Sequence, residues 1–549
     1  MTWPEAAIRW YAFLLVATWG WAPLARLLLA RLADRGAAVA RPLALLGIVT
    51  LAWLPAALRL LSYSTALLWV VLLAGSVVGW AVALRRGYID RCWLRSLLIA
   101  EFGAAAAFAA FVGLHGYTPA LVATEKPMDI AFLSSGQRAS AMPPADPWFS
   151  GQSINYYYLG YVVFGGVGRL AGVPSTFAFN LALATIFSMS LVAAAGVGYD
   201  AVRAWWSRRA AIAAAALAAF GLVVAGNLYA PMQLARTPSQ TVHAWWWDKQ
   251  VGIGWRSSRI VCDGPRVNND CVRPSVETIN EFPAFSFLLG DLHPHLMALP
   301  FVVASLALAL ALGLRGLARP PTLDRADLVR LAISGVAIGS LYAFNSWDFP
   351  TYLVVALAAV VVGFGPCLRQ VAGAAGVLVA AAVAPWLPFI LTFVPPTGGA
   401  AGGALAAVPI LSRLAGTIGV WTGERTSIGE YLTIFGVPYL FALLLLFAEA
   451  QRPEIARRRH GFAAMAPALA IGLLAILFAA PVLALAGLPL VLAVDRLLAD
   501  HEPTPATFAL GLYALGFALS MVVELFYIRD VFDDRMNTLF KVYYQVWTL

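Results

Sequence analysis

The sequence has little charge, little lysine and little cysteine, and each shortage excludes a class of protein. Only 12% of the 549 residues are Asp, Glu, Lys or Arg, whereas 61% are hydrophobic. Soluble folds need charged side chains to cover their surface, so a soluble globular protein is excluded. Four cysteines in a chain of this length exclude a disulfide-built scaffold and a cysteine-rich metal domain.

The net charge of +9 does not indicate a nucleic-acid partner. The arginines stand in short clusters between apolar runs, as the orientation signals of membrane proteins do. Lysine occurs three times only, at Lys126, Lys249 and Lys541. We therefore expect membrane lipid, and no nucleic acid, as the partner of this surface.

Apolar runs long enough to span a bilayer recur along the whole chain. The first, residues 8–30, is too long for a signal peptide and lacks a basic leader and a small-residue cleavage site. Counting these runs predicts an all-α polytopic membrane protein with roughly 14 transmembrane helices. The chain stops at Leu549 within a new apolar run, so we expect a longer natural protein.

Orientation follows from placing every arginine cluster in the cytoplasm. The N-terminus and all long loops then lie outside, at residues 115–155, 230–285, 393–430 and 527–542. Residues 154–170 would break the parity if they crossed, so we expect an interfacial or re-entrant helix there, with three tyrosines at headgroup level. The prediction is an integral plasma-membrane protein whose active face is extracytoplasmic.

This topology divides the chain into four parts. Residues 1–95 hold additional N-terminal helices, and residues 96–229 begin a core with the acidic loop 115–155 and the helix at 154–170. Residues 230–285 form an outer loop. Residues 286–549 supply the remaining helices.

The first outer loop carries the acids best placed for chemistry. Glu125 and Asp129 are four residues apart and can share one helix face, where they would supply a general base or a metal ligand. Lys126 and Asp146 lie in the same loop. The alternative is a solvated loop with surface acids.

A second cluster reads Gly-Asp-Leu-His-Pro-His and contains Asp291, His293 and His295. It permits three interpretations, namely a divalent metal site (Mg²⁺ or Mn²⁺), an acid–base or phosphate contact, and structural polar packing. Asn345 and Asp348 join two helices, either as a capped tight turn or as polar groups that line a cleft.

The last polar stretch holds Arg535, Asn537 and Lys541. The two cations form the natural pair for an anionic headgroup such as a phosphate, and the alternative is a juxtamembrane loop with interspersed charges. Cys262 and Cys271 enclose a polar hairpin on the oxidising side, where a disulfide is expected.

Several of these motifs together resemble an uncharacterised membrane family named for its "YYY" motif. They are Glu-Lys-Pro-Met-Asp from Glu125, Asp-Pro-Trp from Asp146, Asn-Tyr-Tyr-Tyr from Asn155, Gly-Asp-Leu-His-Pro-His from Gly290, Asn-Ser-Trp-Asp from Asn345 and Arg-Met-Asn-Thr-Leu-Phe-Lys from Arg535. That family in turn is distantly similar to the GT-C membrane glycosyltransferases. The resemblance covers most of the chain from about residue 100 onward.

The resemblance implies a GT-C-like fold and transfer of a sugar from a polyprenyl-phosphate donor, with inversion, at the outer face. It implies that Asp129 or Glu125 activates the acceptor, and Asp146 resembles a further acid of that kind. The remaining expected contacts comprise donor-phosphate ligands at Lys126, Arg138, Arg535 and Lys541, and substrate contacts at Tyr156, Tyr157 and Asn537. The second outer loop has no Asp-x-Asp pair, so the Asp291 cluster is its one candidate replacement.

Two alternatives belong to other classes of protein. A lipid-headgroup or glycan transporter would use the same polar groups to bind and pass a headgroup, but it should show internal repeats and broken helices near the midplane. The polar motifs gather at one face instead. A non-catalytic assembly subunit would keep the fold without the chemistry.

Overall fold

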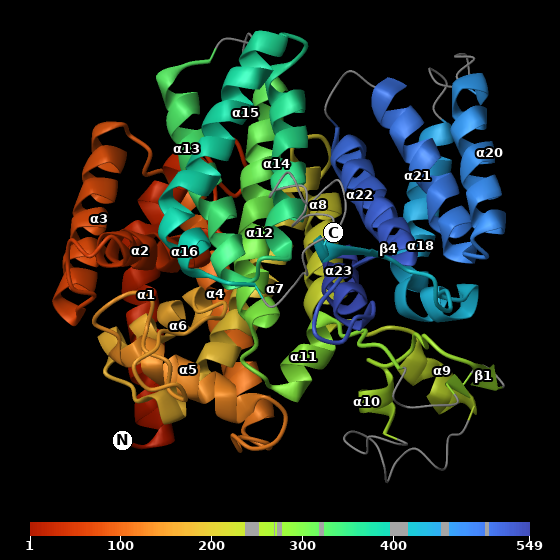
Figure 1. Ribbon diagram of the computed structural model, residues 1–549. Helices are drawn as coiled ribbons and strands as arrows, with labels where there is room; N and C mark the ends of the chain where they lie inside the picture. Colours follow the sequence, from red (N-terminus) through yellow and green to blue (C-terminus); the bar gives the residue numbers. More distant parts are fainter. Residues whose placement is uncertain are drawn as a thin grey trace. The chain divides into compact units, whose positions relative to one another are not determined.

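A computed structural model describes residues 1–236, 252–267, 270–271, 277–317, 323–395, 416–451, 461–499 and 504–549. Helices dominate these residues, and the described strands, four in number, have two or three residues each (Figure 1). The all-α polytopic fold expected from the apolar runs is confirmed. Lys249 and most of the loop at 393–430 lie outside the described residues.

Eleven described helices are long and apolar enough to cross a membrane, or up to 12 if one bent pair counts as a single span. The bent pair is α8 (Arg208–Ala219), extended by the π-helical η1 (Phe220–Val224), with α9 (Tyr229–Arg236). The eleven are α1 (Trp3–Leu28), α2 (Ala40–Ala57), α3 (Thr65–Arg85), α4 (Arg91–His115), α7 (Ser175–Arg203), α12 (Pro294–Gly313), α13 (Arg325–Phe344), α15 (Leu368–Val383) continued by η4 (Ala384–Trp386) and α16 (Leu387–Thr392), α18 (Ile428–Ala450), α21 (Pro481–Ala499) and α22 (Pro505–Leu525).

The count is lower than the predicted 14 because some apolar runs form shorter helices. The apolar run at 350–366 forms α14 (Asp348–Phe364), which has 17 residues, and the run at 462–479 forms α20 (Gly461–Leu477). The apolar run at 284–314 is divided into α11 (Pro283–Leu289) and α12. Gly290 takes a left-handed φ of +71° there, and Pro294 starts a new helix.

The chain divides into two compact units. Unit 1 contains residues 1–224 and 286–394, and unit 2 contains residues 225–285 and 395–549. The three N-terminal helices, which the sequence analysis set apart, belong to unit 1. Trp10 of α1 donates a 2.8 Å hydrogen bond to Thr185 of α7, and Trp53 of α2 donates a 3.3 Å bond to Tyr158.

Two short helices of unit 1 come from the first long loop. They are α5 (Lys126–Arg138) and α6 (Leu159–Ala171), and both lie at the end of unit 1 that holds the N-terminus (Figure 1). Glycine permits their close crossing, because a Cβ on Gly136 would lie 2.8 Å from the carbonyl oxygen of Tyr161.

The 13-residue α6 is too short to span a bilayer, as expected. Its environment differs from the predicted headgroup level, because Tyr161, Phe164 and their neighbours are fully buried in protein. Helices α1, α2, α3, α5 and α7 all pack against it. The tyrosines at 156–158 therefore turn inward instead of lying in an aromatic belt.

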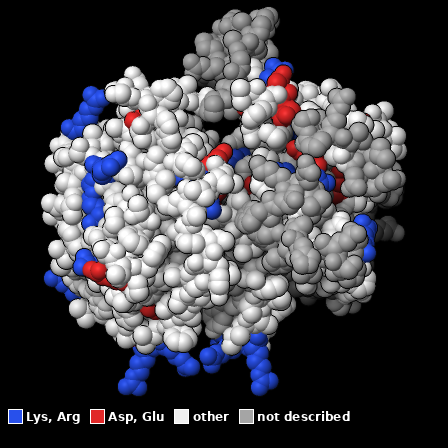
Figure 2. Space-filling model, turned by 90° about the horizontal axis from the view of Figure 1, so that it is seen from below, with Lys and Arg blue, Asp and Glu red and all other residues white. Residues whose placement is uncertain are grey.

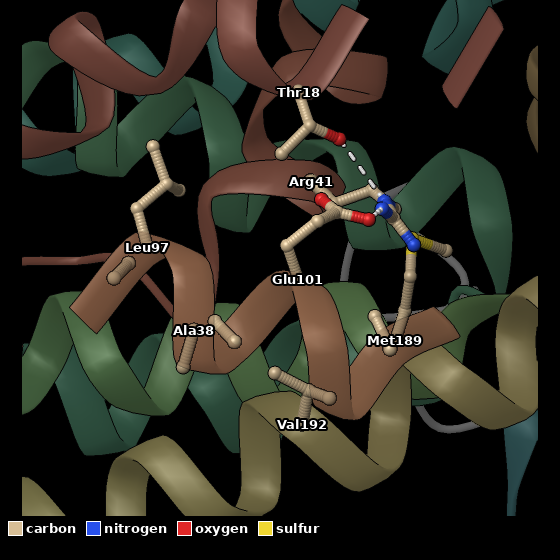
Figure 3. Close-up of a pocket in the computed structure, with 10 residues that line it drawn as sticks. Thr18, Ala38, Arg41, Leu97, Glu101, Met189 and Val192 are labelled. Carbon is tan, nitrogen blue, oxygen red and sulfur yellow. Dashed lines mark hydrogen bonds and ion pairs between the residues drawn. The ribbon is translucent and has the colours of Figure 1, made fainter. Parts of the chain in front are cut away.

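A buried arginine within the spans of unit 1 is paired, as its desolvation requires. Arg41 of α2 forms an ion pair with Glu101 of α4, and its Nε donates to Thr18 of α1 at 3.0 Å. Tyr11 donates to the same glutamate at 2.5 Å. Thr18, Arg41 and Glu101 border a small cavity of about 20 Å³ (Figure 3), which is also lined by Met189 and Val192 of α7.

A group of arginines gathers near the start of α13. Arg31 and Arg315 both contact Asp327, at 3.1 and 2.8 Å, and Asp327 is almost fully buried. The far end of α13 carries Asn345, roughly 27 Å away at 1.5 Å per residue. This arginine group and the polar turn at Asn345 thus lie at opposite ends of one helix, as the predicted topology requires.

Unit 2 is built on α18, α20, α21, α22 and α23 (Met536–Thr548), with the short α10 (Ile253–Arg256). Its buried core contains Tyr431, Phe435, Phe517 and Tyr543. Strand β3 (Ile418–Val420) pairs antiparallel with β4 (Phe526–Ile528), and β1 (Arg266–Val267) pairs with β2 (Asp270–Cys271). The polar stretch expected as a loop at 527–542 therefore begins as a strand and continues into a helix.

Candidate functional site

Four polar segments far apart in the sequence meet at one end of unit 1. They are the start of α5, the tyrosine run before α6, the turn between α11 and α12, and the turn between α13 and α14. Figure 2 views the molecule from the end at which α5 lies, where charged side chains form small groups on a mostly uncharged surface.

Asp129 is the most deeply placed acid of this group. It lies in the first turn of α5, is fully buried, and accepts a 2.6 Å hydrogen bond from the Tyr161 hydroxyl on Oδ1. No described residue hydrogen-bonds its Oδ2. Burial raises the pKa of Asp129 from 3.8 to about 7, opposed by nearby His293 and by the Tyr161 hydrogen bond. A carboxyl with such a pKa can both accept and release a proton at neutral pH.

Glu125 and His293 form a carboxylate–imidazole pair beside Asp129. Glu125 Oε2 lies 2.8 Å from His293 Nδ1, and the glutamate side chain is 55% exposed. The other ring nitrogen of His293 faces the Tyr156 hydroxyl at 3.4 Å. The carboxylate therefore orients the ring, and the pair forms the exposed part of the site above the buried Asp129.

Asp291 is held by the turn before α5. The Thr124 hydroxyl donates a 2.6 Å hydrogen bond to Asp291 Oδ1. Burial raises the pKa of Asp291, and the Thr124 bond and the Lys126 ammonium oppose that rise. Lys126 is half-buried at the first residue of α5, so its charge adds to the positive end of the helix dipole.

Gly290 fixes the approach of this turn to α4. Its φ of +71° favours glycine, and a Cβ there would lie 2.6 Å from Cε1 of His115. His115 Nε2 is in turn 3.1 Å from Oδ1 of Asn180. His115 therefore packs against the turn that carries Asp291, and Asn180 holds the His115 ring. Neither residue was predicted from the sequence to belong to the site.

The second and fourth segments meet through Tyr157. Its hydroxyl lies 3.0 Å from the Ser346 hydroxyl in the turn between α13 and α14. Asn345 donates to Asp348 at 3.0 Å, which is the capped turn that the sequence permitted. Asn345 and Asp348 are both buried, so they stabilise the wall of the site.

His295 completes the histidine pair but faces elsewhere. Its ring centroid is 5.0 Å from that of His293, and its Nε2 lies 3.4 Å from the Ser286 hydroxyl. Pro294 starts α12 between the two histidines and separates their directions. Among the residues that the structure describes, no three His, Cys, Asp or Glu side chains are grouped so as to hold a metal ion.

Asp146 and Arg138 have contacts away from this group. Asp146 Oδ1 accepts hydrogen bonds from the backbone N–H of Trp148 and Phe149, at 2.8 and 2.9 Å, and so caps a turn. Arg138 is exposed at the last residue of α5, the opposite end of that helix from Lys126. The structure brings neither residue to Asp129.

Arg535 lies in unit 2 and has a different task from the phosphate contact expected of it. It is fully buried, binds Asp263 with Nε and Nη2 at 2.9 and 2.7 Å, and binds Glu524 with Nη1 at 3.1 Å. Thr426 accepts a further bond. Because its donors are directed at these protein acceptors, Arg535 is a structural ion-pair centre.

The other predicted residues of unit 2 take separate places. Asn537 donates to Asp530 at 2.6 Å, and Lys541 lies on α23 with its ammonium 4.3 Å from the Phe540 ring centroid. The predicted disulfide is confirmed, since Cys262 and Cys271 are bonded with their Cα atoms 5.6 Å apart. It closes the loop that presents Asp263 to Arg535.

Sequence reasoning named most side chains of the unit 1 site but missed their supports. Thr124 directly precedes the motif at Glu125, and Tyr161 follows the tyrosine run; neither was given a role, although they hold Asp291 and Asp129. They are 167 and 32 residues away from those acids in the sequence, so no local pattern links each pair. His115 and Asn180 gave no signal either, since both belong to apolar spans.

Comparison with known proteins gives one match. Neither the curated proteins nor the solved structures contain a match to the chain. A family model described as "Uncharacterized membrane protein (DUF2298)" matches residues 47–549. The match begins inside α2, so it includes α3, which the sequence analysis had assigned to an N-terminal addition. Covering nine-tenths of the sequence, it confirms the resemblance to an uncharacterised membrane family, and the chain belongs to family DUF2298.

Proposed function

We propose that this protein is a membrane glycosyltransferase that moves a sugar from a polyprenyl-phosphate donor to an acceptor hydroxyl, with Asp129 as general base. The observation that carries the proposal is the Asp129 carboxyl. One of its oxygens is held by Tyr161, and the other has no described partner. Its pKa of about 7 suits proton transfer at neutral pH.

The proposed step is a single displacement. The acceptor hydroxyl gives its proton to Asp129 Oδ2 while its oxygen forms a bond to the anomeric carbon. The bond from that carbon to the phosphate oxygen breaks, and polyprenyl phosphate leaves with the electron pair. Attack opposite the leaving group inverts the anomeric centre.

Lys126 is the cation proposed for the leaving phosphate. It stands at the N-terminal residue of α5, where the helix dipole also favours an anion. Burial lowers the pKa of Lys126, which the neighbouring Asp291 opposes. A half-buried ammonium stabilises developing negative charge more strongly than one in water does.

Asp129 is fully buried, so an acceptor must enter the protein to reach Oδ2. The exposed Glu125–His293 pair and Tyr156 lie where the acceptor would enter. The plasma membrane is the proposed location, with this end of unit 1 outside.

The test is turnover of radiolabelled polyprenyl-phosphate sugars by the purified full chain in detergent, with Asp129→Asn alongside. Release of polyprenyl phosphate that Asp129→Asn abolishes supports the transferase. The matched control is Glu5→Gln, which removes a 43%-exposed carboxylate from α1. Donor binding without turnover, the same in both variants, would instead favour a headgroup transporter.

A further inference from the structure

Three arginines of unit 1 converge on one aspartate near the start of α13. Asp327 is almost fully buried, and its carboxylate lies 3.1, 2.8 and 3.5 Å from Arg31, Arg315 and Arg330. These four side chains are called the arginine cluster below. Buried charges are normally paired, and one carboxylate cannot balance three guanidinium groups.

Arg315 is the cation that neutralises Asp327. Its Nε and Nη2 both bind Oδ2 at 2.8 Å, and both side chains are 1% exposed. The same guanidinium donates to the Gly363 carbonyl at 3.2 Å and lies 4.1 Å from the Phe364 ring centroid. Because Arg315 and Asp327 form a closed pair, the excess positive charge of the cluster belongs to Arg31 and Arg330.

Arg31 and Arg330 are held more loosely than Arg315. Arg31 makes a single 3.1 Å hydrogen bond to Asp327 Oδ1. Arg330 lies 3.5 Å from the same oxygen, and its Nε and Nη1 form no hydrogen bond with any described residue. Burial lowers the pKa of Arg31, and the charge on Arg330 lowers it further, against the hydrogen bond to Asp327. An anion shared by the two guanidinium groups would therefore stabilise both.

The acids of the neighbouring turns have other partners. Asp34 accepts two backbone N–H groups of its own turn, and Asp90 forms ion pairs with two further arginines. Asp324 caps α13 by accepting the Asp327 N–H at 2.7 Å. Within the described part of the chain, none of these three acids forms an ion pair with Arg31 or Arg330.

The position of Arg330 on α13 indicates which anion reaches it. The helix has 20 residues and is roughly 30 Å long, about the thickness of the hydrocarbon core, so its second turn, with Arg330, lies near the headgroups. Val329 and Ile333 are four residues apart on one face, and they are 55% and 41% exposed, as side chains that face lipid are. A phospholipid has its phosphate at this level and its tails beside such side chains.

We infer that Arg31 and Arg330 bind the phosphate group of an anionic phospholipid, with a tail along Val329 and Ile333. The side chains of Arg31 and Arg330 are 17% and 20% exposed, so each presents part of its guanidinium to the membrane surface. The planar fork of arginine matches phosphate oxygens. This end of α13 is the predicted cytoplasmic one, where anionic lipids attract basic groups. The site uses none of the residues of the proposed transfer reaction.

Two single substitutions remove the proposed phosphate contacts while the Arg315–Asp327 pair remains. They are Arg330→Gln on α13 and Arg31→Gln on the turn after α1, so the site is tested from two separate elements. Arg325→Gln is the matched control, because Arg325 is exposed, lies on α13 five residues before Arg330 and is outside the arginine cluster.

The experiment is native mass spectrometry of the delipidated full chain in detergent, titrated with phosphatidylglycerol, phosphatidylcholine or inorganic phosphate. We expect wild type and Arg325→Gln to bind one phosphatidylglycerol equally, and more tightly than phosphatidylcholine. Arg330→Gln and Arg31→Gln should each bind phosphatidylglycerol about fivefold more weakly, the effect of one arginine beside anionic lipid. The double variant should bind it about 25-fold more weakly if the two contacts are independent.

Three results would overturn the inference. An equal loss of affinity in Arg325→Gln and Arg330→Gln would mean that only the overall charge of this end attracts lipid. Equal binding of phosphatidylglycerol and phosphatidylcholine by wild type would mean that the cluster does not select an anion. Displacement of the lipid by inorganic phosphate would assign the cluster to a soluble anion. Thermal unfolding checks that each variant is folded, and Arg31→Gln alone decides the matter if Arg330→Gln is not.

Discussion

Replacing Asp129 by asparagine should make the protein more stable while removing the proposed activity. The buried carboxyl has a pKa raised from 3.8 to about 7, so the folded protein binds its proton more tightly than the unfolded chain does. Asparagine keeps the size and a hydrogen-bond acceptor for Tyr161 and never ionises. The substitution therefore removes the free-energy cost of burying an ionisable carboxyl, which the native protein retains for the proposed function.

The magnitude and its pH dependence follow from the two pKa values. Below pH 3.8 the carboxyl is protonated in both the folded and the unfolded state, so it does not lower the free energy of unfolding. Between 3.8 and about 7 the unfolded chain loses the proton first, so folding stability falls as pH rises. Above about 7 the loss is constant, at about 4 kcal/mol as an upper limit. We expect Asp129→Asn to escape this loss.

Thermal unfolding in detergent between pH 5 and 8.5 measures the effect, with Glu5→Gln as the control. The melting temperature of Asp129→Asn should exceed that of wild type by a margin that grows toward pH 7 and then stays level. Glu5→Gln should follow wild type throughout, because the ion pair that Glu5 forms with Arg9 is exposed and contributes little to stability. A margin that does not change with pH, or a less stable Asp129→Asn at pH 8, would refute the reasoning about this carboxyl.

Two further substitutions test the supports of each unit. Gly290→Ala should lower the free energy of unfolding by about 1–3 kcal/mol, since it combines a left-handed φ with a 2.6 Å approach to His115. Gly87→Ala, with a φ of +63° and open space, should cost less, and equal costs would refute the clash. Arg535→Gln should lower the free energy of unfolding by about 3–5 kcal/mol in denaturant titration. The reason is that Asp263 and Glu524 would stay buried without the cation that both of them bind. A loss below 1 kcal/mol would contradict the structural role.

Much of the fold could be predicted from the sequence, because apolar runs and arginine clusters are local signals. The break at Gly290–Pro294 was not predicted, although both residues were visible. Within a 30-residue apolar run the choice between one bent helix and two separate helices depends on what the turn packs against, and here His115 of α4 is that neighbour.

The site residues illustrate the same limit. Glu125 and Asp129 were found together, but which of them is buried depends on α6 packing over α5, and spacing within α5 cannot show that. Arg535 was assigned a phosphate because its acidic partner Asp263 is 272 residues away in the sequence. The acids and cations of a motif can be read locally, whereas their pairing is set by tertiary contacts. Sidedness in the membrane stays a prediction.

The most direct test of the proposed mechanism is the pH dependence of kcat/KM for release of polyprenyl phosphate from a lipid-linked sugar. If Asp129 is the base, the rate rises from pH 5.5 through a single ionisation near pH 7 and then levels off. Asp129→Asn should lose roughly 10²–10⁴-fold in rate and show no such ionisation. A wild-type rate that is independent of pH over this range, or an Asp129→Asn variant that turns over as fast as wild type, would contradict the account.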